Sequence, residues 1–321
     1  MAYHHGKLDR PDEPLPDSSF EFVDAGYGKN FVKMLHIRRD GPTHYIKEFT
    51  VNTQLTLDSK KDYLFGDNSD IVATDSQKNT VYVMAKLHGV KSPEEFGLLL
   101  CSHFLSKYPH VVKVRVCLEE HPWERMIADG TPHNHAFIST PSTVRFSTII
   151  FKRGAMPEIT SGLKGLRVIK TTQSGFEHFI HDEFATLPDT HERVFSTVVY
   201  AKWHYASTNG VDYDKAWHTV KNCILDAFAG PPDTGIFSPS VQNTLYIAQK
   251  EVLERVPQMG LIEVELPNKH YVPVDFSKFS KITGAQNDEV FLPFDAPAGN
   301  IKAVLGRKSL LPHVFENRSK L

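Results

Sequence analysis

The sequence predicts an α+β protein made of two tandem domains, each an antiparallel sheet with helices on one face. Apolar and polar residues alternate over several segments, as they do in half-buried antiparallel strands. The same order of elements, a hairpin, two helices and a further hairpin, also occurs twice. The two Ser-Pro helix starts, at Ser92 and Ser238, are about 140 residues apart. So are the two segments that begin at Pro132 and Pro267. A chain of 321 residues is long enough for two such domains.

The first half contains a hairpin, two helices and two strands in that order. Asp40-Gly41-Pro42 supplies the hairpin turn. Ser92 is expected to cap the second helix, with Pro93 at its first position and Glu95 completing a capping box. The expected ranges are 31–37 and 49–57 for the hairpin, about 71–87 and 93–108 for the helices, and 112–118 and about 135–138 for the strands.

The second half repeats this order. The expected ranges are strands at 166–171 and 194–205 with a short helix near 176–184 between them, helices at about 213–228 and 239–255, and a strand at 261–266. Val241, Leu245, Ala248 and Val252 fall on one face of the last helix, spaced for core packing. Sheets of this kind have exposed edges, which subunits can cover by pairing, so we expect an oligomer.

Composition argues against several classes of function. Lys and Arg number 36 and Asp and Glu number 38, so the net charge of −2 gives no reason to expect nucleic acid or a membrane surface as partner. No segment approaches the ~20 apolar residues of a membrane span. Three cysteines without close spacing are typical of a reducing interior. Dinucleotide, nucleoside triphosphate and serine hydrolase motifs are absent from the sequence.

The two ends of the chain carry different signals. Residues 1–19 are polar and lack an apolar secretory segment, so they are expected to form a mobile leader. The chain ends in Ser319-Lys320-Leu321, the tripeptide that the peroxisomal import receptor binds. The sequence therefore predicts a peroxisomal protein, and a peroxisomal location suits an oxidase that makes hydrogen peroxide.

Five segments together resemble the urate oxidase family, over the chain from about Tyr27 to the C-terminus. They are Tyr27-Gly28-Lys29-Asn30, Asp67–Thr80, Lys170–Phe176, Ser238–Gln242 and Leu266–Tyr271. The block 67–80 is the most specific, whereas the four residues around Lys29 would be weak alone. The resemblance implies two tandem tunnelling-fold domains, 20–150 and 151–306, followed by a tail at 307–321. It also implies a homotetramer around a sheet-lined tunnel, with active sites between subunits.

The family's reaction, an oxidoreductase step in purine catabolism, converts urate, O2 and water to 5-hydroxyisourate and hydrogen peroxide. The resemblance implies no metal and no organic cofactor, with O2 as co-substrate. Without a cofactor the substrate itself must be the reductant. Removing a further proton makes the purine easier to oxidise, so the site needs a base and a rigid grip on the ring.

The resemblance assigns the proton chemistry to three residues. Lys29 is the candidate base, Thr74 would relay the proton, and His270 would orient Lys29 or pass protons. Asn268, two residues before His270, would face the same cavity and handle oxygen. Without the resemblance, a lysine in a glycine-containing turn reads as a solvated surface residue.

The remaining candidates would hold the substrate. Arg193 would donate parallel hydrogen bonds to one edge of the anion, and Gln242 would bind the opposite edge. Phe176 would stack on the ring, Val241 would offer a backbone contact, and Asp75 would position Thr74. Taken alone, Arg193 is more simply explained by a surface ion pair with Glu192 or Asp189, and Phe176 by a place in the core.

Two alternatives use the same fold. His133 and His135 form an H-x-H pair on a strand, and a zinc-dependent enzyme acting on pterins would recruit Cys101 or Cys117 as a third ligand. A purine-binding protein that has lost the chemistry is the other. Stoichiometric zinc would favour the first, and binding without turnover would favour the second.

Overall fold

The computed structural model describes residues 19–284, 286–294 and 296–309, and it shows an antiparallel sheet covered by helices, an α+β fold. The coarse fold class expected from the sequence is therefore confirmed. The C-terminal tripeptide, and the expected leader apart from its last residue, lie outside the described residues. The chain divides into two compact units, one comprising residues up to Glu119 together with Thr148–Glu158, and the other Glu120–Ser147 together with the residues from Ile159 onward.

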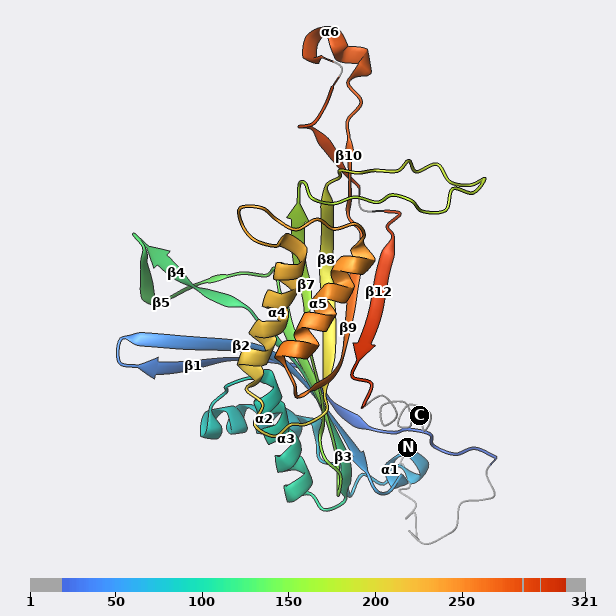
Figure 1. Ribbon diagram of the computed structural model, residues 1–321. Coiled ribbons are helices and arrows are strands. Elements are labelled where there is room, and N and C mark those ends of the chain that lie inside the picture. The colour runs from blue at the N-terminus through green and yellow to red at the C-terminus, as the bar shows by residue number, and fades with distance from the viewer. Residues whose placement is uncertain (1–18, 285, 295, 310–321) are drawn as a thin grey trace, which may run out of the picture. The chain divides into compact units, whose positions relative to one another are not determined.

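The first unit begins with the expected hairpin (Figure 1). Its strands follow the order β1-β2-β3-β6. The element bounds are β1 (Tyr27–Asp40), β2 (Thr43–Leu57), α1 (Lys61–Phe65), α2 (Thr74–His88), α3 (Pro93–Lys107), β3 (Val111–His121) and β6 (Val144–Lys152), whose first residues belong to the second unit. The expected hairpin, both helices and the strand after them are confirmed.

Helix α3 starts where its capping signal predicts. Ser92 Oγ accepts a hydrogen bond from the Glu95 backbone N–H at 3.1 Å, and the Ser92 hydroxyl also contacts the Glu95 carboxylate at 2.9 Å. The first of these bonds satisfies a backbone N–H that a helix start leaves without an intrahelical partner, and the second joins the two side chains. The helix buries Phe96, Leu100 and Phe104, so that its apolar face closes the core of this unit.

The second unit contains a sheet of order β7-β8-β9-β12 and two small two-stranded sheets, β4-β5 and β10-β11. The element bounds are β4 (Trp123–Ala128), β5 (Thr131–Ser139), β7 (Glu158–Lys170), β8 (Phe195–Tyr205), α4 (Tyr213–Ala229), α5 (Val241–Arg255), β9 (Met259–Pro267), β10 (His270–Pro273), η1 (Ser277–Phe279), α6 (Ser280–Thr283), β11 (Phe291–Phe294) and β12 (Asn300–Gly306).

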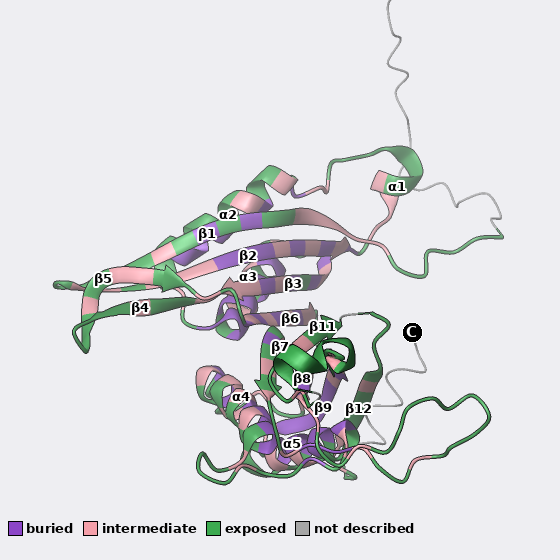
Figure 2. Ribbon diagram, turned by 90° about the horizontal axis from the view of Figure 1, so that it is seen from above, coloured by how far each residue is buried: buried purple, intermediate pink, exposed green. Residues whose placement is uncertain are grey.

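Helices α4 and α5 lie side by side over one face of this sheet (Figure 1). Buried and exposed residues alternate along both helices, so each has one packed side (Figure 2). Val241, Leu245, Ala248 and Val252 are each at most 3% exposed, which confirms the apolar face expected from their spacing. The main core of this unit lies between that face and strands β7, β8 and β9.

Two details of the expected second half are wrong. Residues 176–184 form no helix, because Phe176 instead pairs with Thr190 in an isolated antiparallel bridge and His178 has a positive φ of 62°. Helix α5 begins at Val241 and is capped by Ser240 rather than by Ser238. Ser238 is used in a tertiary contact described below, which local sequence patterns do not reveal.

Candidate active site

The first cluster of candidate residues is built on a bulge in β1. The register of β1 against β2 shifts between Lys29 and Val32, and Phe31 between them has a positive φ of 57°. The Lys29 N–H lies 3.4 Å from Thr53 Oγ1. A Cβ on Gly28 would lie 1.6 Å from the Thr53 carbonyl oxygen, so only glycine allows the two strands to approach here. The bulge thus sets the position of Lys29.

A buried hydrogen-bond chain connects this bulge to the start of α2. The Thr53 hydroxyl donates to Gln77 Oε1 at 2.9 Å, and Gln77 Nε2 donates to the Val72 carbonyl at 3.1 Å. Both Thr53 and Gln77 are fully enclosed. Thr74, half-buried, is the first residue of α2, where backbone N–H groups and the helix dipole favour negative charge. Sequence reasoning missed Thr53 and Gln77, although Gln77 lies within the 67–80 block.

Asp75 completes this cluster and is engaged by its own helix. Its carboxylate accepts from Lys78 Nζ at 2.6 Å and from Asn79 Nδ2 at 3.0 Å. The hydrogen bond from Lys78 lowers the pKa of Asp75, and the charge of Lys29 lowers it further. The charge of Lys29 therefore acts on Asp75, the neighbour of Thr74 at the start of α2.

The second cluster centres on Arg193 and Phe176. The Arg193 guanidinium carbon lies 5.4 Å from the centre of the Phe176 ring. The backbone N–H of Arg193 donates to the Ser174 carbonyl at 2.8 Å. Burial lowers the pKa of Arg193, and an arginine stays charged at neutral pH. Among the described residues Arg193 forms no ion pair, so the simpler surface-pair interpretation is wrong. A desolvated cation beside an aromatic face suits a flat anion.

The start of α5 lies against this cluster. Gly175 N–H donates to the Ser238 carbonyl at 3.0 Å, and Ser238 N–H donates to the Gln173 carbonyl at 2.8 Å. These bonds hold the segment carrying Phe176 beside the segment that leads into Val241 and Gln242. Val241 is buried and Gln242 is exposed, so the amide of Gln242 is free to meet a ligand.

Asn268 and His270 follow strand β9 in the same unit. Asn268 forms an isolated bridge with Thr197, near the start of β8 and four positions after Arg193. His270 opens β10 and pairs with Phe294 of β11. Both residues are half-buried. The second unit thus contains the candidate residues Asn268 and His270 in addition to the Arg193 cluster.

The histidine pair at His133 and His135 does not form a metal site within the part of the chain that the structure describes. Their rings meet edge to face at 4.7 Å, and His133 Nδ1 accepts backbone N–H bonds from His135 and Ala136 at 3.2 and 3.0 Å. No group of three or more His, Cys, Asp or Glu side chains suited to a metal ion occurs among the described residues. None of the described helices has the length and apolar character of a membrane span.

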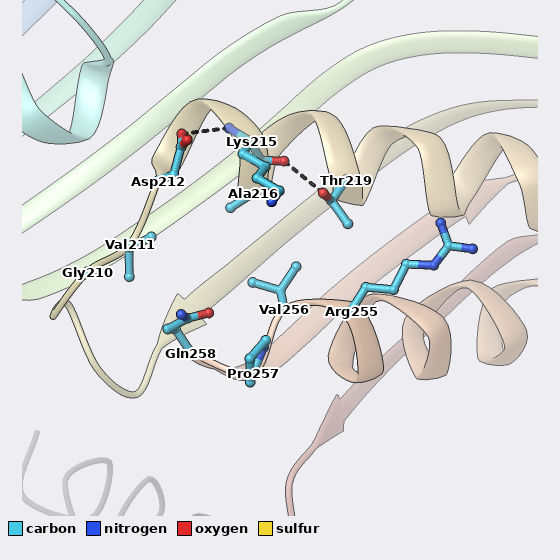
Figure 3. A pocket seen from close by; sticks show the side chains of 10 residues that line it. All are labelled: Gly210, Val211, Asp212, Lys215, Ala216, Thr219, Arg255, Val256, Pro257 and Gln258. Carbon is cyan, nitrogen blue, oxygen red and sulfur yellow. Dashed lines mark hydrogen bonds between the residues drawn. The ribbon is translucent and has the colours of Figure 1, made fainter.

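A separate pocket lies between the start of α4 and the end of α5 (Figure 3). It contains none of the candidate residues. Asp212 there caps α4 by accepting from the Lys215 N–H at 3.0 Å, and the Thr219 hydroxyl donates to the Lys215 carbonyl at 2.8 Å. These hydrogen bonds stabilise the start of α4.

The structure is an α+β protein with two clusters of polar and aromatic residues, one around the Lys29 bulge and the start of α2, and the other with the Arg193 guanidinium beside the Phe176 ring. The chain belongs to the uricase family, since the family model described as Uricase matches residues 25–150 and 159–302. A uricase of Oryctolagus cuniculus is 51% identical over 288 residues, 90% of this chain and 95% of the relative. A uricase of Drosophila pseudoobscura pseudoobscura is 48% identical, covering 92% of each chain. The crystal structure of uricase from Arthrobacter globiformis superposes with a TM-score of 0.82 at 34% identity, covering 91% of this chain and 96% of that one.

Proposed function

We propose that this protein is a urate oxidase that converts urate, O2 and water to 5-hydroxyisourate and hydrogen peroxide. The observation that carries the proposal is the Arg193 guanidinium set over the Phe176 ring beside the start of α5, in a chain of the uricase family. Urate is a flat anion with donors and acceptors around its edge, which matches a cation, a ring face and a free amide.

In the bound state Arg193 donates to one edge of the urate ring and offsets its charge. Phe176 stacks on the ring face, and Gln242 binds the opposite edge through its amide. Val241 contributes its backbone N–H at the start of α5, where the helix dipole favours an anion. Together these groups hold the ring in one orientation, which favours the chemical step.

Oxidation begins when urate loses a further proton to Lys29 through Thr74, with Asp75 positioning Thr74. The more electron-rich purine then transfers two electrons to O2, which takes up two protons and leaves as hydrogen peroxide. Water then adds to C5, a carbon shared by the two fused rings, and this gives 5-hydroxyisourate. Asn268 holds the oxygen or water above the ring, and His270 passes protons back to Lys29.

The proposed assembly is a homotetramer of two tandem tunnelling-fold domains per chain, 20–150 and 151–306, around a sheet-lined tunnel. In this assembly Lys29, Thr74 and Asp75 of one subunit meet the Arg193 cluster of a neighbour. The resemblance supports this arrangement, and the exposed strand edges of the sheet are consistent with pairing between subunits.

The test is the loss of urate ultraviolet absorbance, followed together with oxygen uptake, in the presence of a chelator. We expect urate loss that resists the chelator and consumes one O2 per urate, because neither a metal nor an organic cofactor takes part. Loss of activity with the chelator, restored by zinc, would favour the His133–His135 alternative. Urate binding without oxygen uptake would indicate the non-catalytic alternative.

Ser319-Lys320-Leu321 is proposed to direct the protein to peroxisomes through the import receptor. Removing these three residues is expected to leave urate oxidation by the purified protein unchanged, since the tail carries no candidate site residue. In cells the same truncation should shift the protein out of peroxisomes, as measured by fluorescence microscopy of a tagged N-terminus. Peroxisomal retention of the truncated protein would refute this role.

A further inference from the structure

Lys170, the last residue of β7, is partly buried in the second unit. Its Nζ donates to the Ile236 carbonyl and to Ser238 Oγ, each at 2.8 Å. The same atom lies 5.8 Å from the centre of the Phe195 ring and 5.6 Å from that of Phe228. The charge is therefore held by a carbonyl, a hydroxyl and two ring faces.

This environment is costly for a lysine. Burial lowers the pKa of Lys170 to about 8, and the more distant charge of Glu192 opposes that change. Within the described part of the chain, no carboxylate forms an ion pair with Lys170. Partly burying a charge with only neutral contact partners costs free energy, so a solvated-surface role does not explain its position.

Ser238, which Lys170 contacts, is a junction between the two segments that carry the substrate-binding residues. It is 2% exposed, and its backbone is hydrogen-bonded to Gln173 and Gly175 on the Phe176 side. Its hydroxyl is hydrogen-bonded at 2.8 Å to the hydroxyl of Thr244 in α5. Any shift of Ser238 would therefore move both segments.

We propose that Lys170 is a positioning residue for purine binding. It holds Ser238 in place, so that the Phe176–Arg193 cluster and the start of α5 can bind the same urate ring. This inference rests on the proposed function, because it assumes that urate occupies that site. Its ammonium group connects the end of β7 to the 236–238 segment through two hydrogen bonds and does not itself contact the substrate.

A positioning role of this kind predicts a particular kinetic pattern. The proton chemistry is assigned to Lys29, Thr74 and His270, none of which contacts Lys170 among the described interactions. Loosening the grip on the ring should therefore weaken urate binding more than it slows turnover. Loss of binding common to the ground state and the transition state raises KM and leaves kcat nearly unchanged.

The experiment compares Lys170→Met with Lys170→Arg in the full-length protein. Methionine keeps an unbranched chain of similar size without charge or donors, whereas arginine retains the charge and can donate to both oxygens. We expect Lys170→Met to raise the KM for urate about tenfold, which is about 1.4 kcal/mol, and to change kcat less than about threefold. Lys170→Arg should return KM to within about threefold of wild type. Lys215→Met, an exposed lysine of α4, is the matched control and should leave both constants unchanged.

Urate binding measured by calorimetry without oxygen gives a readout that does not need turnover, and Ser238→Ala tests the junction if Lys170→Met unfolds. Ser238→Ala should weaken urate binding in the same direction. A KM for Lys170→Met equal to that of wild type, or a loss of kcat alone, would overturn the proposal while leaving the proposed function intact. Absence of urate turnover in wild type and in Lys215→Met would instead overturn the proposed function.

Discussion

Replacing Lys29 by methionine is expected to lower kcat for urate oxidation by about 10²–10⁴, the range for loss of a general base. Lys29 lies at the β1 bulge beside Thr53, and its charge reaches Asp75 next to Thr74. Urate bound to the Arg193 cluster would then keep the proton whose removal makes it oxidisable. Steady-state kinetics give kcat, and anaerobic calorimetry should show urate affinity within about threefold of wild type, because the binding groups are unchanged.

Lys33→Met is the matched control, because Lys33 is an exposed lysine of the same strand. It should leave kcat unchanged. If Lys29→Met keeps kcat within tenfold of wild type, then another group takes the proton and the assignment of Lys29 is wrong.

Replacing Arg193 by methionine is expected to lower kcat/KM by about 10²–10³, roughly 3–4 kcal/mol, as for truncation of one partner of a buried charge pair. The guanidinium supplies both the charge and the paired donors, and Phe176 alone cannot hold an anion in one orientation. The effect should fall mainly on KM and on calorimetric affinity. Arg255→Met removes an exposed arginine of α5 that is paired with Glu251, and it should change neither constant.

The two impaired variants, assayed together at urate near the wild-type KM, where each alone is nearly inactive, test whether active sites are shared between subunits. In the proposed tetramer, subunits mixed in equal amounts from Lys29→Met and Arg193→Met should recover about a quarter of wild-type activity, because random pairing joins an intact Lys29 to an intact Arg193 in one site of four. Sites formed within one chain would recover nothing, and that result would refute the shared arrangement.

Local patterns predicted most of the elements correctly. Ser92, Pro93 and Glu95 predicted the start of α3, and the spacing of Val241, Leu245, Ala248 and Val252 predicted the buried face of α5. These features depend on neighbours within about one turn, so they can be read along the chain.

The segment 176–184 shows where local reading fails. Its backbone bonds go to Thr190, and His178 N–H donates to Asp189, so partners beyond the segment decide its conformation. The start of α5 was predicted wrongly for a related reason. Ser238-Pro239 resembles a second Ser-Pro helix start, but Ser238 is hydrogen-bonded to Lys170 and Thr244, and Ser240 is the cap.

The sequence by itself determined the family, the coarse fold class and the identities of the candidate residues, because these follow from residue types in a specific order. The tertiary structure alone decided how they are arranged: the bulge that follows Lys29, the Arg193 guanidinium beside the Phe176 ring, and the hydrogen bonds of Ser238. Such contacts join residues far apart in the chain, and they depend on desolvation and close packing that no local pattern encodes. The partly buried ammonium of Lys170 is the clearest case, because a lysine in a sequence is expected to be solvated until its surroundings are known.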